Sequence, residues 1–245
     1  MSTVNVLLDK LTKIKSEDTI SIKLPSTGKD YSFNSISVKQ QKNLLKHAMD
    51  GGGGIVPAFK EMNSIIFDNI VDKTAEISVV DRYPILIALR KKSLGNNIKI
   101  EDKTYDLTEL PSFVKLPKSL TATTVDCMGI KVSLSLPSLQ RDTEYLNRVI
   151  TEVKKAGDDK AKETVAVMYT YEIVKFIESI TFSEGTINFS DITIQDRKTV
   201  VENLPVELNQ QILNFINKVR EFENAFITFS DNAVVPINTL FLTGE

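Results

Sequence analysis

A unit of two short strands, a turn and a capped helix recurs three times along this chain and limits the folds that the chain can adopt. In residues 28–45 an apolar strand residue follows the turn glycine by five positions, and a serine follows it by nine. Residues 129–146 repeat these spacings, and residues 185–201 repeat them one residue shorter. The strand and cap residues of the three copies are Phe33 and Ser37, Leu134 and Ser138, and Phe189 and Thr193.

Alternating apolar residues followed by helical periodicity predict a β-hairpin and then a helix in each copy. We therefore expect an α+β fold in which recurring hairpin-then-helix units pack with several amphipathic helices, without a doubly wound parallel sheet. Any strand-turn-strand-cap-helix unit would show similar spacings, so a duplication remains one of two explanations. Because the period between copies is irregular, no solenoid is expected.

The chain of 245 residues is long enough for one large domain or two modest ones. Residues 111–121 contain two prolines and show no clear period, so they are the candidate boundary. The expected division is an N-terminal amphipathic helix over residues 1–16, a hairpin-helix region over 17–115 and a second one over 116–245. A single domain is the alternative.

The N-terminal segment has an apolar residue at three- and four-residue steps, which predicts an amphipathic helix. Its apolar stripe consists of Val4, Leu7, Leu8, Leu11 and Ile14. Two interpretations are open for this stripe. It could pack on the protein's own core, or it could dock into a groove on a partner protein.

Four consecutive glycines, residues 51–54, raise the question of a phosphate-binding loop. Such a loop needs a preceding strand, a following Gly-Lys-Ser/Thr and backbone N–H groups that converge on the anion. Here a predicted helix precedes the glycines, and Pro57 removes one of the required donors. The sequence therefore predicts a flexible connection between two helices.

Candidates for catalysis or metal binding are few. His47 is the only histidine and follows two leucines of a predicted helix, while Cys127 is the only cysteine and lies beside a hairpin turn. A single cysteine excludes an internal disulfide and a multi-cysteine zinc site. A net charge of −2 argues against a dedicated nucleic-acid-binding protein. We predict no enzyme and no catalytic, cofactor-binding or metal-binding residue.

The most apolar segment, residues 164–182, is about as long as a membrane span. It carries Glu172, Lys175 and Glu178, and charged residues at that depth of a bilayer cost about 2.5 kcal/mol or more each. We therefore expect a buried helix of a soluble protein, with the three charged residues forming a polar stripe along it.

Two segments resemble the signature segments of the baseplate hub and hub-assembly proteins of T-even-like contractile-tailed bacteriophages. They are "ISIKLPSTGKDYSFNSISVKQQKNLLKHA" and "VVDRYPILIALRKKSLGNNIKI". The resemblance covers most of residues 19–101 and continues more loosely to the C-terminus. The matching structural residues are Leu24, Pro25, Ser26 and Gly28, then Leu44 and Leu45 at the end of the stretch from Lys39, and then Asp81, Leu89, Arg90, Ser93 and Gly95.

The resemblance implies a non-enzymatic hub subunit or hub-assembly factor that acts through protein-protein contacts. Its partners would be other phage baseplate or hub proteins, which it would bind in the host cytoplasm during assembly. A built-in subunit would then be located in the baseplate of the virion tail. No nucleic acid, membrane insertion or cofactor is implied. Some relatives carry paired cysteines in a C-terminal hairpin, but Phe229 and Asn232 stand at comparable places here, so no metal is carried over. The alternative is a generic cytoplasmic α+β adaptor or regulatory protein unrelated to phage.

Overall fold

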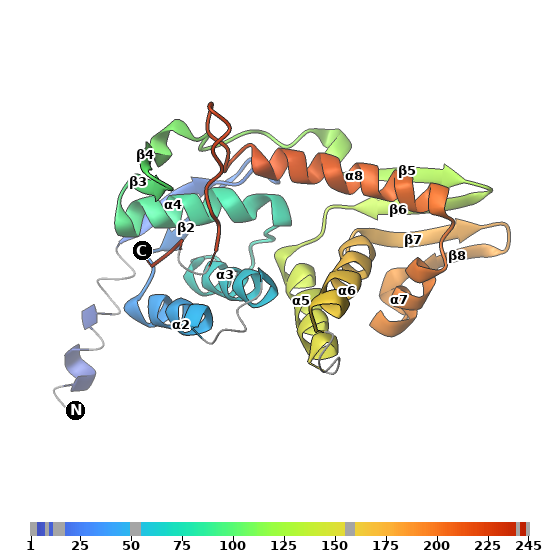
Figure 1. The fold of residues 1–245 in the computed structure, drawn as a ribbon, viewed down its shortest axis with the longest axis horizontal. Coiled ribbons are helices and arrows are strands. Elements are labelled where there is room, and N and C mark those ends of the chain that lie inside the picture. Colours follow the sequence, from blue (N-terminus) through green and yellow to red (C-terminus); the bar gives the residue numbers. More distant parts are fainter. Residues whose placement is uncertain are drawn as a thin grey trace. The chain divides into compact units, whose positions relative to one another are not determined.

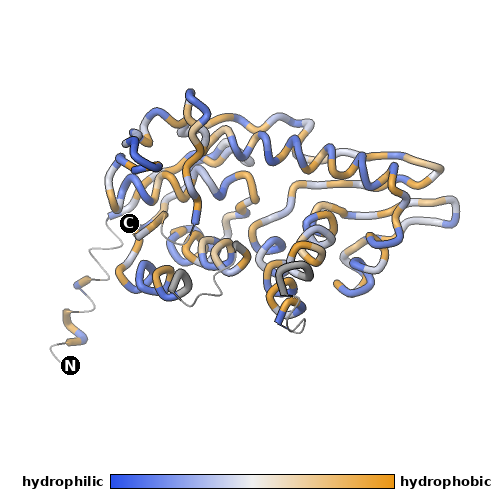
Figure 2. Tube along the Cα trace, viewed as in Figure 1, coloured by the Kyte–Doolittle hydropathy of each residue, from blue (hydrophilic) through white to orange (hydrophobic). Residues whose placement is uncertain are grey.

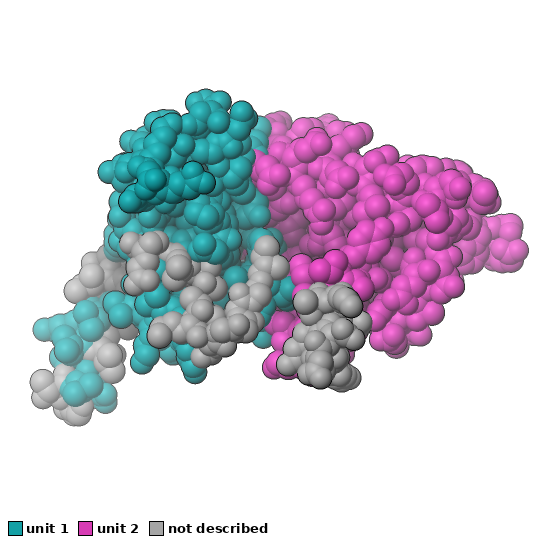
Figure 3. Space-filling view, viewed as in Figure 1, with its two compact units in different colours: residues 1–76, 81–114, 225–245 teal, residues 77–80, 115–224 magenta. Residues whose placement is uncertain are grey.

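The computed structural model divides into two compact units, which Figure 3 shows in different colours. Unit 1 consists of residues 1–76, 81–114 and 225–245, and unit 2 of residues 77–80 and 115–224. The structure describes residues 4–7, 10–11, 18–49, 55–154, 160–238 and 241–243. Several helices together with small antiparallel sheets confirm the α+β class.

From residue 18 on, the described part of unit 1 contains two β-hairpins and the helices α2, α3 and α4 (Figure 1). Its elements are β1 (Thr19–Lys23), β2 (Asp30–Asn34), α2 (Val38–Met49), α3 (Ile55–Asn69), α4 (Arg82–Leu94), β3 (Asn97–Ile100) and β4 (Lys103–Asp106). The strands pair as β1 with β2 and as β3 with β4, both antiparallel. Ile22 and Phe33 alternate with exposed residues and are buried, which confirms the predicted first hairpin.

The described residues of unit 2 form a four-stranded antiparallel sheet of order β5-β6-β7-β8 and four α-helices. Its elements are β5 (Ala122–Cys127), β6 (Ile130–Ser135), α5 (Leu139–Val153), α6 (Lys160–Val174), β7 (Ile177–Phe182), β8 (Gly185–Asn188), α7 (Ile194–Glu202) and α8 (Val206–Asn224). The second and third recurring units are β5-β6-α5 and β7-β8-α7.

The cap predicted for each recurring unit is present. Ser37 and Gln40 form a capping box at the start of α2, in which the Ser37 N–H donates to Gln40 Oε1 at 2.9 Å and the Gln40 N–H donates to Ser37 Oγ at 3.3 Å. Ser138 Oγ and Thr193 Oγ1 accept backbone N–H groups in the first turns of α5 and α7.

Helix α8 has one apolar face, on which five side chains are buried and Phe222 is half-buried. Figure 2 shows the matching alternation of hydrophobic and hydrophilic residues along α8. The buried residues are Leu208, Ile212, Phe215, Ile216 and Val219.

The prediction of one helix over residues 164–182 is wrong. Helix α6 ends at Val174, and residues 177–182 form β7, in which Ile180 lies opposite Val132 of β6. Glu178 therefore lies on a strand and shares no helical stripe with Glu172 and Lys175, which still pair three residues apart at 2.6 Å. Long-range pairing with β6 outweighs the local helical pattern here. In the described part of the chain, no helix combines the length and the apolar character that a membrane span requires.

The hairpin predicted at the C-terminus is reduced to a tight turn with one isolated bridge, Thr228 to Val234, among the described residues. The Phe229 N–H donates to the Ala233 carbonyl at 2.8 Å, and Asn232 has a positive φ of 67° inside this turn. The glycine run over residues 51–54 and its predicted role as a connection lie outside the described residues.

Candidate functional site: a groove beside strand β1

Two motif residues that are far apart in the sequence are in contact in unit 1. Ser26 donates two hydrogen bonds to the Asp81 carboxylate, from its N–H at 2.9 Å and from its hydroxyl at 2.6 Å. Asp81 occupies the N-cap position of α4 but makes no side-chain cap. Its fully buried carboxylate instead ties the β1–β2 turn to the start of α4.

The other end of α4 is held by further motif residues. Arg90 donates to the Phe241 carbonyl at 2.8 Å and to the Asn97 carbonyl at 3.2 Å, and its guanidinium lies 5.2 Å from the Phe241 ring centroid. Burial lowers the pKa of Arg90, but an arginine stays charged at any physiological pH. Ser93 Oγ accepts the Ile36 N–H at 3.4 Å, and Gly95 ends the helix with a φ of 87°.

The remaining motif residues support the same frame by packing. The Gly28 N–H donates to the Leu24 carbonyl at 2.8 Å with a φ of 68°, a conformation that glycine adopts without strain. Leu45 is half-buried. The fully buried members of the set are Leu24, Pro25, Leu44 and Leu89. The motif residues thus hold α4 against the first hairpin.

This frame encloses a groove of about 390 Å³ in unit 1. One side is β1 from Ile20 to Lys23, and the other is the extended segment from Leu110 to Phe113. Helix α4 contributes side chains at steps of three and four residues, so one helix face lines the groove. The α4 residues that line it are Pro84, Ile87, Ala88 and Lys91.

The edge of β1 that does not pair with β2 is open. In an antiparallel pair of strands, two directly opposed residues either exchange N–H···O=C hydrogen bonds with each other or both point their N–H and C=O groups away from the partner strand. The Ser32 carbonyl accepts the Val71 N–H on the outer side of β2, so Ser32 and its partner Ser21 both face away from the ladder. The same holds for Lys23, two residues on. Within the described chain, the backbone groups of Ser21 and Lys23 have no hydrogen-bond partner.

The groove combines apolar walls with a mainly basic rim. Ile22, Ile87 and Leu110 provide nearly buried apolar surface. Lys23 lies with its Nζ 4.8 Å from the centroid of the Phe113 ring, on the far side of the groove. Lys91 adds a second positive charge from α4, and Asp30 is the acidic lining residue.

A second hollow, of about 350 Å³, lies in unit 2 and is the most polar candidate for chemistry. Burial, followed by the neighbouring Glu152, raises the pKa of Tyr171, whose hydroxyl donates to that carboxylate. The Glu152 carboxylate also accepts from Lys198 at 2.7 Å. The raised pKa keeps the tyrosine protonated, so its hydroxyl and Lys198 share the Glu152 carboxylate.

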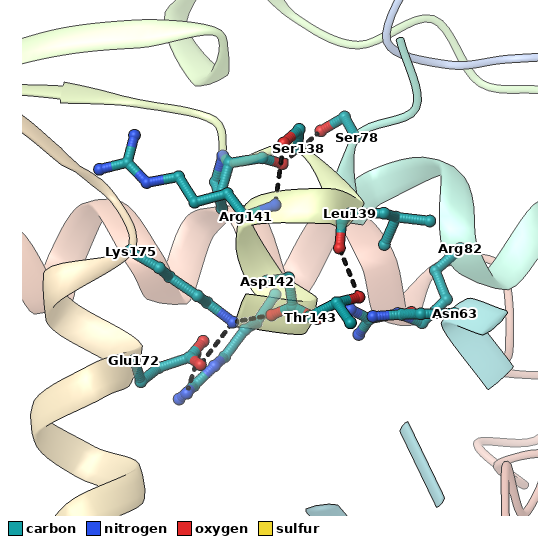
Figure 4. A network of polar contacts seen from close by, with 12 residues as sticks. Asn63, Ser78, Arg82, Ser138, Leu139, Arg141, Asp142, Thr143, Glu172 and Lys175 are labelled. Carbon is teal, nitrogen blue, oxygen red and sulfur yellow. Dashed lines mark hydrogen bonds and ion pairs between the residues drawn. The ribbon is translucent and has the colours of Figure 1, made fainter. Parts of the chain in front are cut away.

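The buried lysine of unit 2 is also paired (Figure 4). Lys175 lies 2.8 Å from Asp142 and 2.6 Å from Glu172, which also contacts Arg220 at 3.2 Å. Burial alone would lower the pKa of Lys175, but the two carboxylates outweigh it and raise the pKa above its ordinary value. The cluster therefore keeps a cation in the interior by surrounding it with acidic groups.

The N-terminal stripe is helical and exposed where the structure describes it. Val4, Leu7 and Leu11 expose 63, 55 and 52% of their surface. Leu8 and Ile14 lie outside the described residues.

Potential metal ligands do not cluster among the described residues, where no group of three or more His, Cys, Asp or Glu side chains could hold an ion. Cys127 is a half-buried free thiol at the end of β5. The His47 side chain is not described. At one of the positions compared with the relatives' cysteines, Phe229 is buried and its ring lies 4.6 Å from that of Tyr105.

Sequence reasoning missed the groove itself. Leu110 to Phe113, next to and within the candidate boundary at residues 111–121, form one of its walls. The available signal was the stripe of Pro84, Ile87 and Lys91 on one face of α4, but nothing in the sequence indicates what that face meets.

A family model described as "T4 bacteriophage base plate protein" matches residues 17–227. A search of curated proteins and a search of solved structures gave no match.

Proposed function

This chain belongs to the T4 bacteriophage base plate protein family, and we propose that it acts in the central hub of the baseplate. It serves there either as a built-in subunit or as a factor that helps the hub assemble and then leaves. It works through protein-protein contacts and catalyses no reaction. Its partners are other baseplate or hub proteins, met in the host cytoplasm during assembly.

The way in which the motif residues are used supports a role in binding rather than catalysis. Asp81, Arg90 and Ser93 are engaged in hydrogen bonds that hold α4 in place. A catalytic carboxylate or cation would instead need to face a cavity beside a nucleophile or a base. Meanwhile Leu7 and Leu11 offer apolar surface for contact.

We assign the exposed N-terminal stripe the role of a docking helix. An amphipathic helix near a chain end can lay its apolar face into a groove on a partner. Exposure of more than half of Val4, Leu7 and Leu11 supports this assignment over packing on the protein's own core.

The decisive experiment combines a protein inventory of purified mature particles with deletion of the gene in the phage that encodes this chain. Stoichiometric detection by quantitative mass spectrometry would identify a built-in subunit. Absence from particles, together with failed hubs in the deletion phage, would identify an assembly factor. Normal hubs in the deletion phage, with no trace of the protein in particles, would refute a hub role.

A further inference from the structure

We propose that the groove beside β1 binds an extended segment of a partner protein as an added β-strand, and that this segment carries an aspartate or glutamate next to an apolar residue. The inference rests on the proposed function only in taking the partner to be a protein. It adds where the partner binds, in which conformation and with which side chains.

The strand conformation follows from the open edge of β1. The backbone N–H and C=O groups of Ser21 and Lys23 face the groove side and have no partner in the described chain. An extended peptide placed beside β1 satisfies these groups with main-chain hydrogen bonds, which is how many recognition domains bind a strand. A helix or a globular surface would leave them unpaired.

The side-chain chemistry follows from the walls. Successive side chains of a strand point to opposite sides, so alternate residues of the added segment reach the apolar surface of Ile22, Ile87 and Leu110. Lys23 and Lys91 outnumber Asp30 in the lining, which favours a carboxylate on the incoming segment. A volume of about 390 Å³ suits a short segment rather than a whole domain.

A second copy of this chain fits the groove less well than a different protein. If β1 paired with β1 of a second copy of the chain, the carboxylate of that copy nearest to Lys23 would be Asp18. Asp18 already forms an ion pair with Lys92 at 2.5 Å and accepts a hydrogen bond from Ser35 at 2.6 Å. These contacts would have to be given up for Asp18 to reach Lys23, so we take the acidic group to come from another protein.

The test uses the full chain, labelled with nitrogen-15, and the capped peptide Gly-Thr-Val-Asp-Val-Thr-Gly. We expect saturable shifts of the Ser21 and Lys23 amide signals and slower hydrogen exchange of both amides. Two N-methylated peptides separate the two edges of the bound strand. Methylation of the alternate amides that face β1 should abolish binding, and methylation of the other alternate amides should leave binding intact. Strand addition would be overturned if both N-methylated peptides still bind. It would also be overturned if the amide signals shift only for residues outside the groove.

Charge reversal tests the predicted carboxylate. The wild-type chain should bind the aspartate peptide about tenfold more tightly than a matched lysine peptide, a difference typical of a well-placed charge pair. Lys91→Glu should reverse this preference, and Lys99→Glu, on the exposed side of β3, should leave it unchanged. Lys23→Glu, on an exposed strand position, provides a second test if Lys91→Glu does not fold. An unaltered preference in the folded groove variants would refute the proposed charge match.

The occupant is tested by sedimentation. The wild-type chain should stay monomeric at the concentrations used for the titration. A dimer that Ser21→Pro dissolves would show that a second copy occupies the edge and would overturn the proposal, because proline at an outward-facing edge position blocks pairing without breaking the hairpin. The particle inventory is independent of these results, so failure here leaves the hub role standing.

Discussion

Ser26 and Asp81, 55 residues apart, are joined through both the N–H and the hydroxyl of Ser26, at 2.9 and 2.6 Å from the two carboxylate oxygens. The hydroxyl bond cannot form unless the turn after β1 meets the first turn of α4. Strand β1 and helix α4, which this contact joins, both line the groove, so the contact couples the packing of unit 1 to the shape of the binding surface that we propose.

Ser26→Ala should destabilise the protein by about 1.5–3 kcal/mol, because it removes a hydrogen bond to a buried charged group. Urea denaturation measures the loss. Ser64→Ala, at an exposed position of α3, should change the free energy of unfolding by less than about 0.5 kcal/mol. Combining Ser26→Ala with Asp81→Asn should cost less than the sum of the single changes; strict additivity would show that the two residues do not interact.

Lys175→Met should cost about 3–5 kcal/mol, since it leaves Asp142 in the interior without its lysine. The folded pKa of Lys175 is raised, so its contribution is complete below the unfolded value of about 10.4 and is lost only as the pH rises through the higher folded value. The difference in unfolding free energy between wild type and variant should therefore be constant from about pH 7 to 9. Convergence of the two proteins within that range would contradict this sign, and Lys218→Met on the exposed side of α8 is the matched control.

Lys103→Ala should raise the pKa of Asp231. The hydrogen bond from Lys103, at 2.5 Å, and then that from the Ala233 N–H hold this pKa below its ordinary value. A lowered pKa means that ionised Asp231 favours the folded state above the unfolded value and that this contribution fades as the pH falls through the folded value. Carboxyl carbon NMR shifts across an acid titration measure the change. An Asp231 titration identical in wild type and variant would rule out the pairing, while Lys99→Ala should have no effect.

Leu7→Asp combined with Leu11→Asp should leave the monomer folded and weaken partner capture. Both side chains are more than half exposed, so the change in unfolding free energy should be within about 0.5 kcal/mol. Circular dichroism melting checks the fold, and complementation of a deletion phage checks capture. Val38→Asp replaces a different exposed apolar residue, 80% exposed on α2, and should complement normally. Unfolding or aggregation of the double variant would place the helix in the core.

Local patterns were sufficient for much of the fold. The predicted caps Ser37, Ser138 and Thr193 mark the starts of α2, α5 and α7. Such features depend on residues within a few positions of one another, so the sequence displays both partners together.

Long-range partners were settled only by the tertiary structure. Nothing near Asp81 in the sequence indicates that its carboxylate accepts hydrogen bonds from Ser26. Nothing near Ile177 indicates that its segment pairs with β6 in a sheet. Contacts between distant residues depend on how the helices and hairpins pack, and a linear pattern does not record that packing. The groove beside β1 is of the same kind, because its walls come from three separate segments that become neighbours only when unit 1 folds.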